Sequence, residues 1–149
     1  AEALVGKAVG ARNRSALEAA VRVALKWSLY VAVLFCLVFL DAGKPLVRLL
    51  TDLPDVIGVA DRYQPWLVVM PLVADWSYLY DGVFVGATRA KEMRNIMLIS
   101  SFLVFIPAWY AFGFLGNHGL WLALGLFLAS RGIGMHYYYR TRVLTAIPA

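Results

Sequence analysis

Four apolar runs, each long enough to cross a lipid bilayer, constrain the fold of this chain more than any other feature. A helix needs about 20 residues to cross roughly 30 Å of hydrocarbon, and such runs cover residues 23–42, 66–88, 96–115 and 120–139. None has the length and flanks of a cleaved signal peptide. Hydrophobic residues make up 62% of the 149 and charged residues 15%, which excludes an ordinary soluble domain. The sequence therefore predicts an all-α, polytopic membrane helix bundle with four transmembrane helices.

The segment before the first run has a different character. Residues 1–10 are apolar and lack an initial methionine, and a basic amphipathic stretch follows them. We interpret residues 1–22 as the end of a preceding helix and a cytoplasmic linker, and residues 23–149 as the transmembrane bundle. The apolar start favours a fragment of a longer protein over a processed small one. Residues 43–65 form the longest predicted loop, and we expect it to lie along the outer membrane interface, with a short amphipathic piece at residues 45–51.

Lysine and arginine fall unevenly on the two sides of these runs. Ten of the 14 lie near the chain ends and between the second and third runs, three lie between the first and second runs, and Arg131 lies inside the fourth. Because cytoplasmic loops carry the excess of positive charge, both chain ends are predicted to be cytoplasmic. A nucleic-acid partner is not expected, since the basic residues lie between apolar runs rather than on one water-facing surface.

Two carboxylates, Asp75 and Asp81, interrupt the second run. Ionisable groups in hydrocarbon cost at least a few kcal/mol each and usually serve a function. At 1.5 Å per residue, Asp75 lies roughly 14 Å deep, near the midplane, and Asp81 roughly 22 Å deep. Six residues place them about 120° apart around the helix, which predicts separate roles. Asp75 is a candidate for contact with a coupling ion or substrate, or for a structural ion pair; Asp81 is a candidate for a structural pair or a cap.

Arg131 is the candidate partner of these carboxylates. By the same arithmetic it lies roughly 17 Å deep, and a helical side chain leans toward the helix start, which brings it to the level of Asp75. This depth is compatible with a pair between Asp75 and Arg131. Two alternatives remain open: an ion pair with Asp81, and a side chain that reaches toward the inner interface.

Proline and glycine modify the predicted spans. Pro71 and Pro107 each remove a backbone hydrogen bond and favour a kink. Two glycine pairs, residues 82 and 86 and residues 6 and 10, have the spacing that lets helices approach closely. This spacing predicts packing rather than chemistry.

No arrangement typical of a metal site or an enzyme is visible in the sequence. His118 and His136 have no ligand residues at metal-binding spacing, and Cys36 lies alone inside an apolar run. The sequence shows no nucleophile–base pair and no glycine-rich phosphate loop. Neither catalysis nor a bound cofactor is therefore expected.

Three segments resemble a known transporter family. Residues 80–95, Tyr-Asp-Gly-Val-Phe-Val-Gly-Ala-Thr-Arg-Ala-Lys-Glu-Met-Arg-Asn, are similar to the tenth helix and following inner loop of the DinF-like branch of multidrug and toxic compound extrusion (MATE) transporters. Residues 3–10 resemble the inner end of the eighth helix, and residues 119–123 with 129–132 resemble the twelfth. The resemblance covers nearly the whole chain.

This resemblance implies a secondary antiporter of twelve helices in two lobes, with this chain as most of the C-terminal lobe. The implied substrate is an amphipathic or cationic small molecule, expelled across the plasma (inner) membrane of a bacterium in exchange for protons or sodium. The implied partners are the lipid bilayer and the missing N-terminal lobe. Sodium-coupled relatives place a cation-binding carboxylate near the position of Tyr78, which neither Asp75 nor Asp81 matches, and DinF-like members place the proton-linked carboxylate in the first helix. The coupling ion therefore stays open.

Functions of other kinds also remain open. A lipid-linked oligosaccharide flippase has a related fold with a more basic cavity. A small membrane subunit or scaffold would use the same helices to hold a partner, and a membrane enzyme is a third alternative.

Overall fold

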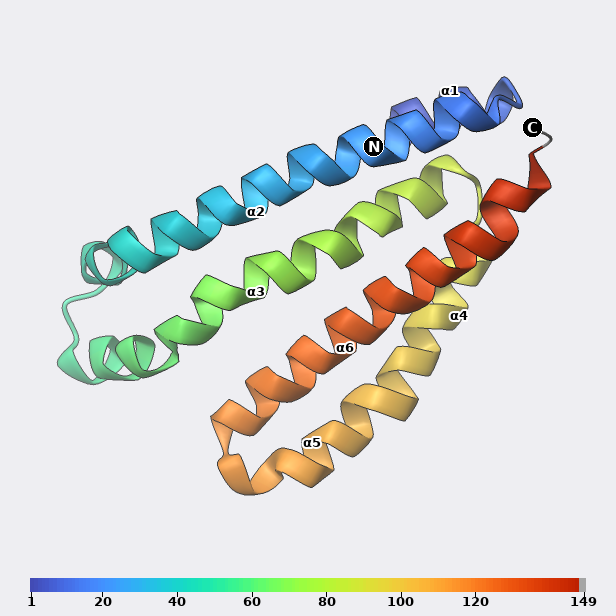
Figure 1. Ribbon diagram of the computed structural model, residues 1–149. Coiled ribbons are helices and arrows are strands. Elements are labelled where there is room, and N and C mark those ends of the chain that lie inside the picture. The colour runs from blue at the N-terminus through green and yellow to red at the C-terminus, as the bar shows by residue number, and fades with distance from the viewer. Residues whose placement is uncertain (148–149) are drawn as a thin grey trace.

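The computed structural model describes residues 1–147, and nearly all of them are helical (Figure 1). The six α-helices are α1 (Glu2–Gly10), α2 (Arg14–Leu50), α3 (Pro54–Gly86), α4 (Ala90–Ser100), α5 (Ile106–Phe112) and α6 (Asn117–Tyr138). Four short turns extend them: the π-helical η1 (Ser101–Phe105), the 3-10 turn η2 (Gly113–Leu115), the π-helical η3 (Tyr139–Val143) and the 3-10 turn η4 (Leu144–Ala146). Residues 1–147 contain no strand, so the predicted all-α class is confirmed.

The helices pack as an open row with α3 near its centre. α2 packs along one side of α3 and α6 along the other, while α4, η1 and α5 pack against α6. α1 folds back beside α2 and covers both α2 and α3. Within residues 1–147, α2 and α6 do not pack directly against each other. The central helix α3 therefore joins the two halves of the row.

Three helical segments are long and apolar enough to cross a membrane: Arg14–Leu50, Pro54–Gly86 and Ala90–Leu115. They contain the first and third predicted spans and all of the second except residues 87–88, which lie in the turn after α3. The fourth predicted span corresponds to α6, which does not belong to this group. Arg131, His118 and His136 lower the mean hydropathy of this helix. That α6 crosses the membrane stays a prediction.

The predicted loop at residues 43–65 is wrong. α2 continues to Leu50 and α3 begins at Pro54, which leaves residues 51–53 between the two helices. Proline suits the first turn of a helix, because the N–H that it lacks would be unpaired there. Pro45 and Pro65 lie inside the helices, and Figure 1 shows the last turns of α2 and the first turns of α3 bending away from the long axes.

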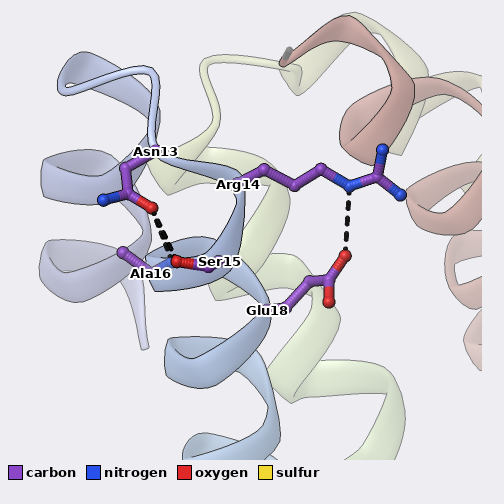
Figure 2. A network of polar contacts seen from close by, with 5 residues as sticks. All are labelled: Asn13, Arg14, Ser15, Ala16 and Glu18. Atoms are coloured by element: carbon purple, nitrogen blue, oxygen red, sulfur yellow. Dashed lines mark hydrogen bonds and ion pairs between the residues drawn. The ribbon is translucent and has the colours of Figure 1, made fainter. Parts of the chain in front are cut away.

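The first long helix begins well before residue 23. Asn13 precedes α2 and accepts a hydrogen bond from the backbone N–H of Ala16 at 2.9 Å (Figure 2). Ser15 donates its hydroxyl to the same Asn13 oxygen at 3.0 Å. An asparagine cap of this kind stabilises a helix start by about 1 kcal/mol. No helix boundary therefore falls at the predicted division between residues 22 and 23.

Pro107 lies just after a local change in helix geometry. It occupies the first turn of α5, directly after the π-helical turn η1. Proline cannot donate the backbone hydrogen bond of a regular helix, and a wider turn before it accommodates that loss. Pro71, in contrast, lies within the uninterrupted α3.

Two turns of the same geometry follow α1 and α3. Arg12 and Thr88 are left-handed, with φ angles of 50° and 57°. The next residue in each turn, Asn13 or Arg89, donates its N–H to a carbonyl five residues back, at 3.0 and 2.8 Å. Figure 1 shows both turns at the same end of the row as the C-terminal segment. The two turns and residues 139–147 form this end, which we name the basic end. Most of the lysines and arginines lie at or near it. Its cytoplasmic location stays a prediction.

Glycines let α1 lie directly on α3 at the basic end. A Cβ atom at Gly86 would come within 2.5 Å of the Glu2 carbonyl oxygen, and one at Gly6 within 3.4 Å of the Gly86 carbonyl oxygen. The close helix approach predicted from the glycine spacing is therefore confirmed for Gly6, Gly82 and Gly86, whereas Gly10 has no neighbouring atom within 4 Å of an added Cβ. The largest fully buried apolar side chains also gather at this end: Val5, Leu17, Tyr80, Val83, Phe84 and Met135.

Away from the basic end, α2 is largely uncovered. Only 6% of the residues in its most apolar 18-residue stretch are buried by the rest of the chain. Trp27, Leu34 and Leu40 are 67%, 59% and 65% exposed. An apolar surface of this extent is not stable in water. It requires lipid or further helices as its neighbour.

Candidate functional site

The central helix α3 presents its two carboxylates to different neighbours. Asp75 contacts α2, and Asp81 contacts α6. The separation around the helix that the sequence predicted is therefore present. We name the two contact zones the α2–α3 crevice, lined by Leu25, Ser28, Leu29, Ala32, Leu72, Asp75 and Trp76, and the α3–α6 seam, which contains Trp76, Ser77, Tyr80, Asp81, Arg131, Gly132 and His136.

An ion pair dominates the α3–α6 seam. One guanidinium nitrogen of Arg131, Nη2, donates to both Asp81 carboxylate oxygens at 2.5 and 2.6 Å. The two side chains are 8% and 24% exposed, with arginine the more buried. Between the same two helices, the Tyr80 hydroxyl and His136 Nδ1 share a hydrogen bond of 2.5 Å. In the seam, α3 and α6 are therefore joined by two polar contacts, and each contact pairs one side chain of α3 with one of α6.

The candidate pair between Asp75 and Arg131 is wrong. Its depth argument agrees with the structure, since a Cβ at Gly132 would lie 3.7 Å from the Ser77 Cα atom, and Arg131 is thus near the level of Asp75. The direction around α3 decides the pairing instead. Ser77 is fully buried and faces α6; at 100° per residue, Asp81 lies about 40° from it and Asp75 about 160°. Arg131 therefore reaches about one turn further along α3 to Asp81, one of the alternatives left open.

The α2–α3 crevice holds Asp75 in a different setting. Ser28 of α2 donates its hydroxyl to the Asp75 carboxylate. The crevice has a volume of about 310 Å³, and apolar side chains form most of its remaining wall. Within residues 1–147, Asp75 forms no salt bridge. A half-buried carboxylate is thus stabilised by a hydroxyl and opens on a hollow large enough for a small cation.

The remaining candidate, Tyr78, is not part of either zone. Its side chain is 59% exposed and has no hydrogen-bond partner in the part of the chain that the structure describes. A role for Tyr78 in a substrate or ion path stays a prediction.

Several partners of these polar groups were missed from the sequence. Ser28 lies in the charge-free centre of the first apolar run, and a hydroxyl at that depth is a signal that could have suggested a carboxylate partner. The histidines also have aromatic partners on α3: Trp66 Nε1 donates to His118 Nδ1 at 2.9 Å, and Tyr80 contacts His136. Residues 1–147 contain no group of three or more His, Cys, Asp or Glu side chains that could hold a metal ion.

A family model described as MatE matches residues 1–110 of the 149. The chain belongs to the MatE family. The match includes residues 80–95, the segment that carries the main resemblance in the sequence, and it also includes Asp75, Asp81 and Ser28. Arg131 and the rest of α6 lie beyond it.

Relatives of this MatE chain occur in bacteria and in a mammal. The chain is 46% identical over 139 residues to the DNA damage-inducible protein F of Escherichia coli (strain K12), covering 93% of this chain and 30% of that protein. It is 25% identical over 150 residues to the uncharacterized transporter YisQ of Bacillus subtilis (strain 168), covering 94% and 31%. It is 26% identical over 132 residues to the multidrug and toxin extrusion protein 1 of Oryctolagus cuniculus, covering 87% and 23%. The chain thus spans less than a third of these relatives' length, and no solved structure matches it.

Proposed function

We propose that this chain forms part of a secondary active transporter that exports amphipathic or cationic toxic compounds in exchange for protons or sodium. Membership of the MatE family supports the proposal, as does similarity to a protein named for multidrug and toxin extrusion. Three helices of membrane-spanning length and hydropathy also support it. The membrane would be the inner membrane of a bacterium, with the basic end in the cytoplasm.

The transport path would include an N-terminal lobe outside this chain. The helices form an open row rather than a closed bundle, and α2 leaves an apolar face uncovered. Helices of a second lobe and lipid are the partners that suit such a face. The substrate would pass between lobes, and no enzymatic step is involved.

Within this function, Asp75 is proposed as the carboxylate that binds the coupling cation. The observation that carries this proposal is the setting of Asp75. Its carboxylate borders a hollow and accepts a hydrogen bond from the Ser28 hydroxyl. Asp81, in contrast, already has a guanidinium on its carboxylate. A carboxylate without a cationic partner inside a membrane-spanning helix is costly to keep there and is suited to bind a cation that enters the hollow beside it.

A change in the charge of Asp75 would act directly on the packing of α2 against α3. With a cation bound, the group is neutral overall and the crevice can close around it. Without the cation, the charge favours exposure to water. Two conformations with different affinity for the cation are the requirement for coupled transport.

The test uses the complete protein in proteoliposomes that contain a fluorescent lipophilic cation. An imposed pH gradient or sodium gradient should drive export of the dye by the natural sequence. Asp75→Asn should abolish the gradient-driven component, whereas Asp55→Asn, which changes an exposed carboxylate on the same helix, should leave it unchanged. Absence of export by the natural sequence under both gradients would contradict the proposed function, and full export by Asp75→Asn would contradict the assigned residue.

A further inference from the structure

A second hollow lies at the basic end, apart from Asp75 and from the Asp81–Arg131 pair. It has a volume of about 540 Å³ and lies between α2, α3, the end of α6 and the turns η3 and η4. Three arginines line it: Arg14 and Arg22 from α2, and Arg140 from η3. Glu18 is the one carboxylate in its lining. The hollow therefore has an excess of positive charge.

Two of the three arginines are not neutralised by a carboxylate. Arg14 Nε donates to Glu18 Oε1 at 3.1 Å, and Figure 2 shows the Arg14 side chain extending from α2 toward the C-terminal segment. Arg22 and Arg140 form no salt bridge within residues 1–147. A guanidinium presents a planar set of donors that fits two phosphate oxygens at once. The hollow thus offers donors suited to a phosphate group.

The rest of the hollow is lined by His136, two tyrosines and aliphatic side chains, and its apolar part continues into the membrane-spanning part of α2. Tyr80, Tyr139 and Leu144 are buried in its wall. Leu25 lines both this hollow and the α2–α3 crevice, and Leu29, one turn further along α2, is 56% exposed. A basic recess at the membrane interface is therefore continuous with an apolar surface that leads toward the midplane.

We propose that this hollow binds the phosphate headgroup of an anionic phospholipid, with an acyl chain along Leu25 and Leu29 of α2. Basic recesses between helices on the positively charged side of membrane proteins are suited to such headgroups. A free phosphate ion would use the arginines alone, whereas a lipid also covers the exposed leucines. The bound lipid would stabilise the contact between α2 and the C-terminal segment. Its acyl chain would border the α2–α3 crevice, which Leu25 and Leu29 also line, but lipid binding requires neither transport nor the Asp75 carboxylate.

The test measures lipid binding to the purified complete protein after removal of native lipid into an uncharged detergent. Phosphatidylglycerol is titrated, and its apparent dissociation constant is obtained by native mass spectrometry. The double variant Arg22→Gln/Arg140→Gln should bind about a hundredfold more weakly, about tenfold for each guanidinium removed from the phosphate. Arg94→Gln changes an exposed arginine of α4 that does not line the hollow, and this variant should bind as the natural sequence does.

A further variant gives the opposite expectation. Glu18→Gln removes the carboxylate that occupies Arg14, and phosphatidylglycerol should bind several-fold more tightly to it. The melting temperature of each variant without lipid confirms that it is folded. Three results would each overturn the proposal: equal binding of phosphatidylethanolamine, displacement of the lipid by inorganic phosphate at equal concentration, or unchanged lipid affinity in the double arginine variant.

Discussion

The α3–α6 seam and the α2–α3 crevice both include an aspartate of α3, but the two aspartates have different partners. One has a cationic partner and the other has a neutral one. In the seam, Asp81 receives two hydrogen bonds from the buried Arg131. In the crevice, Asp75 receives a hydrogen bond from Ser28 and borders a hollow. The two aspartates lie six positions apart on α3. Each faces a different neighbouring helix, and this accounts for the difference between their partners.

Under the proposed function, one membrane helix would combine a fixed contact with an exchangeable one. A buried ion pair resists the loss of either partner, because the remaining charge would be unpaired in a medium of low dielectric. A carboxylate held by a neutral hydroxyl has no such constraint. Under the proposed function, the seam would therefore serve stability and the crevice would serve cation exchange.

The largest expected effect comes from breaking the ion pair of the seam. Arg131→Gln or Asp81→Asn should each lower the free energy of unfolding of the complete protein by about 3–5 kcal/mol, the usual cost of an uncompensated buried charge. The measurement is the yield of folded protein together with its thermal unfolding in detergent. The double variant Asp81→Asn/Arg131→Gln should recover part of the loss. Strictly additive losses would show that the two side chains do not interact.

A smaller effect is expected where α1 covers α3 at the basic end. Gly86→Ala places a methyl group within 2.5 Å of the Glu2 carbonyl oxygen, and overpacking of this kind costs about 1–3 kcal/mol. Gly58 lies in the same helix with no atom within 4 Å of its added Cβ, so Gly58→Ala should be stabilising by about 0.5–1 kcal/mol. Thermal unfolding of the two variants compares them directly. Equal stability of both would mean that α1 does not pack on α3 as the structure shows.

The crevice should respond weakly to loss of its hydrogen bond. Ser28→Ala removes the hydroxyl that donates to Asp75, and a hydrogen bond to a charged group contributes about 1.5–3 kcal/mol, less when water replaces the donor. Because the crevice is open, we expect a loss of about 1 kcal/mol or less in thermal unfolding. A loss as large as that of Arg131→Gln would show that the crevice is as rigid as the seam.

Much of the fold follows from hydropathy, and the errors arise where direction matters. The first three apolar runs lie in helices, apart from residues 87–88 at the end of the second, since a chain in hydrocarbon must satisfy its backbone hydrogen bonds internally. The loop at residues 43–65 was predicted because this stretch lies between two apolar runs, but most of it is helical, and Pro45 and Pro65 lie inside α2 and α3.

The site was predicted in its parts but not in its pairing. Asp75, Asp81 and Arg131 stand out because charges are rare in apolar runs. The depth of each residue could be counted from the sequence. The face of α3 that meets α6 could not be predicted, because apolar residues are distributed around the whole helix and do not favour one face. Ser28 was missed for the same reason, since its contact depends on the packing of two helices far apart in sequence.

The most direct test compares transport per folded molecule for the two zones of α3. In proteoliposomes of the complete protein, Asp75→Asn should fold in normal amount and lose export driven by a pH or sodium gradient. The double variant Asp81→Asn/Arg131→Gln should give less folded protein, and each folded molecule should still export. The reverse pattern, with transport retained by Asp75→Asn and abolished per folded molecule in the double variant, would contradict the assignment of exchange to the crevice and stability to the seam.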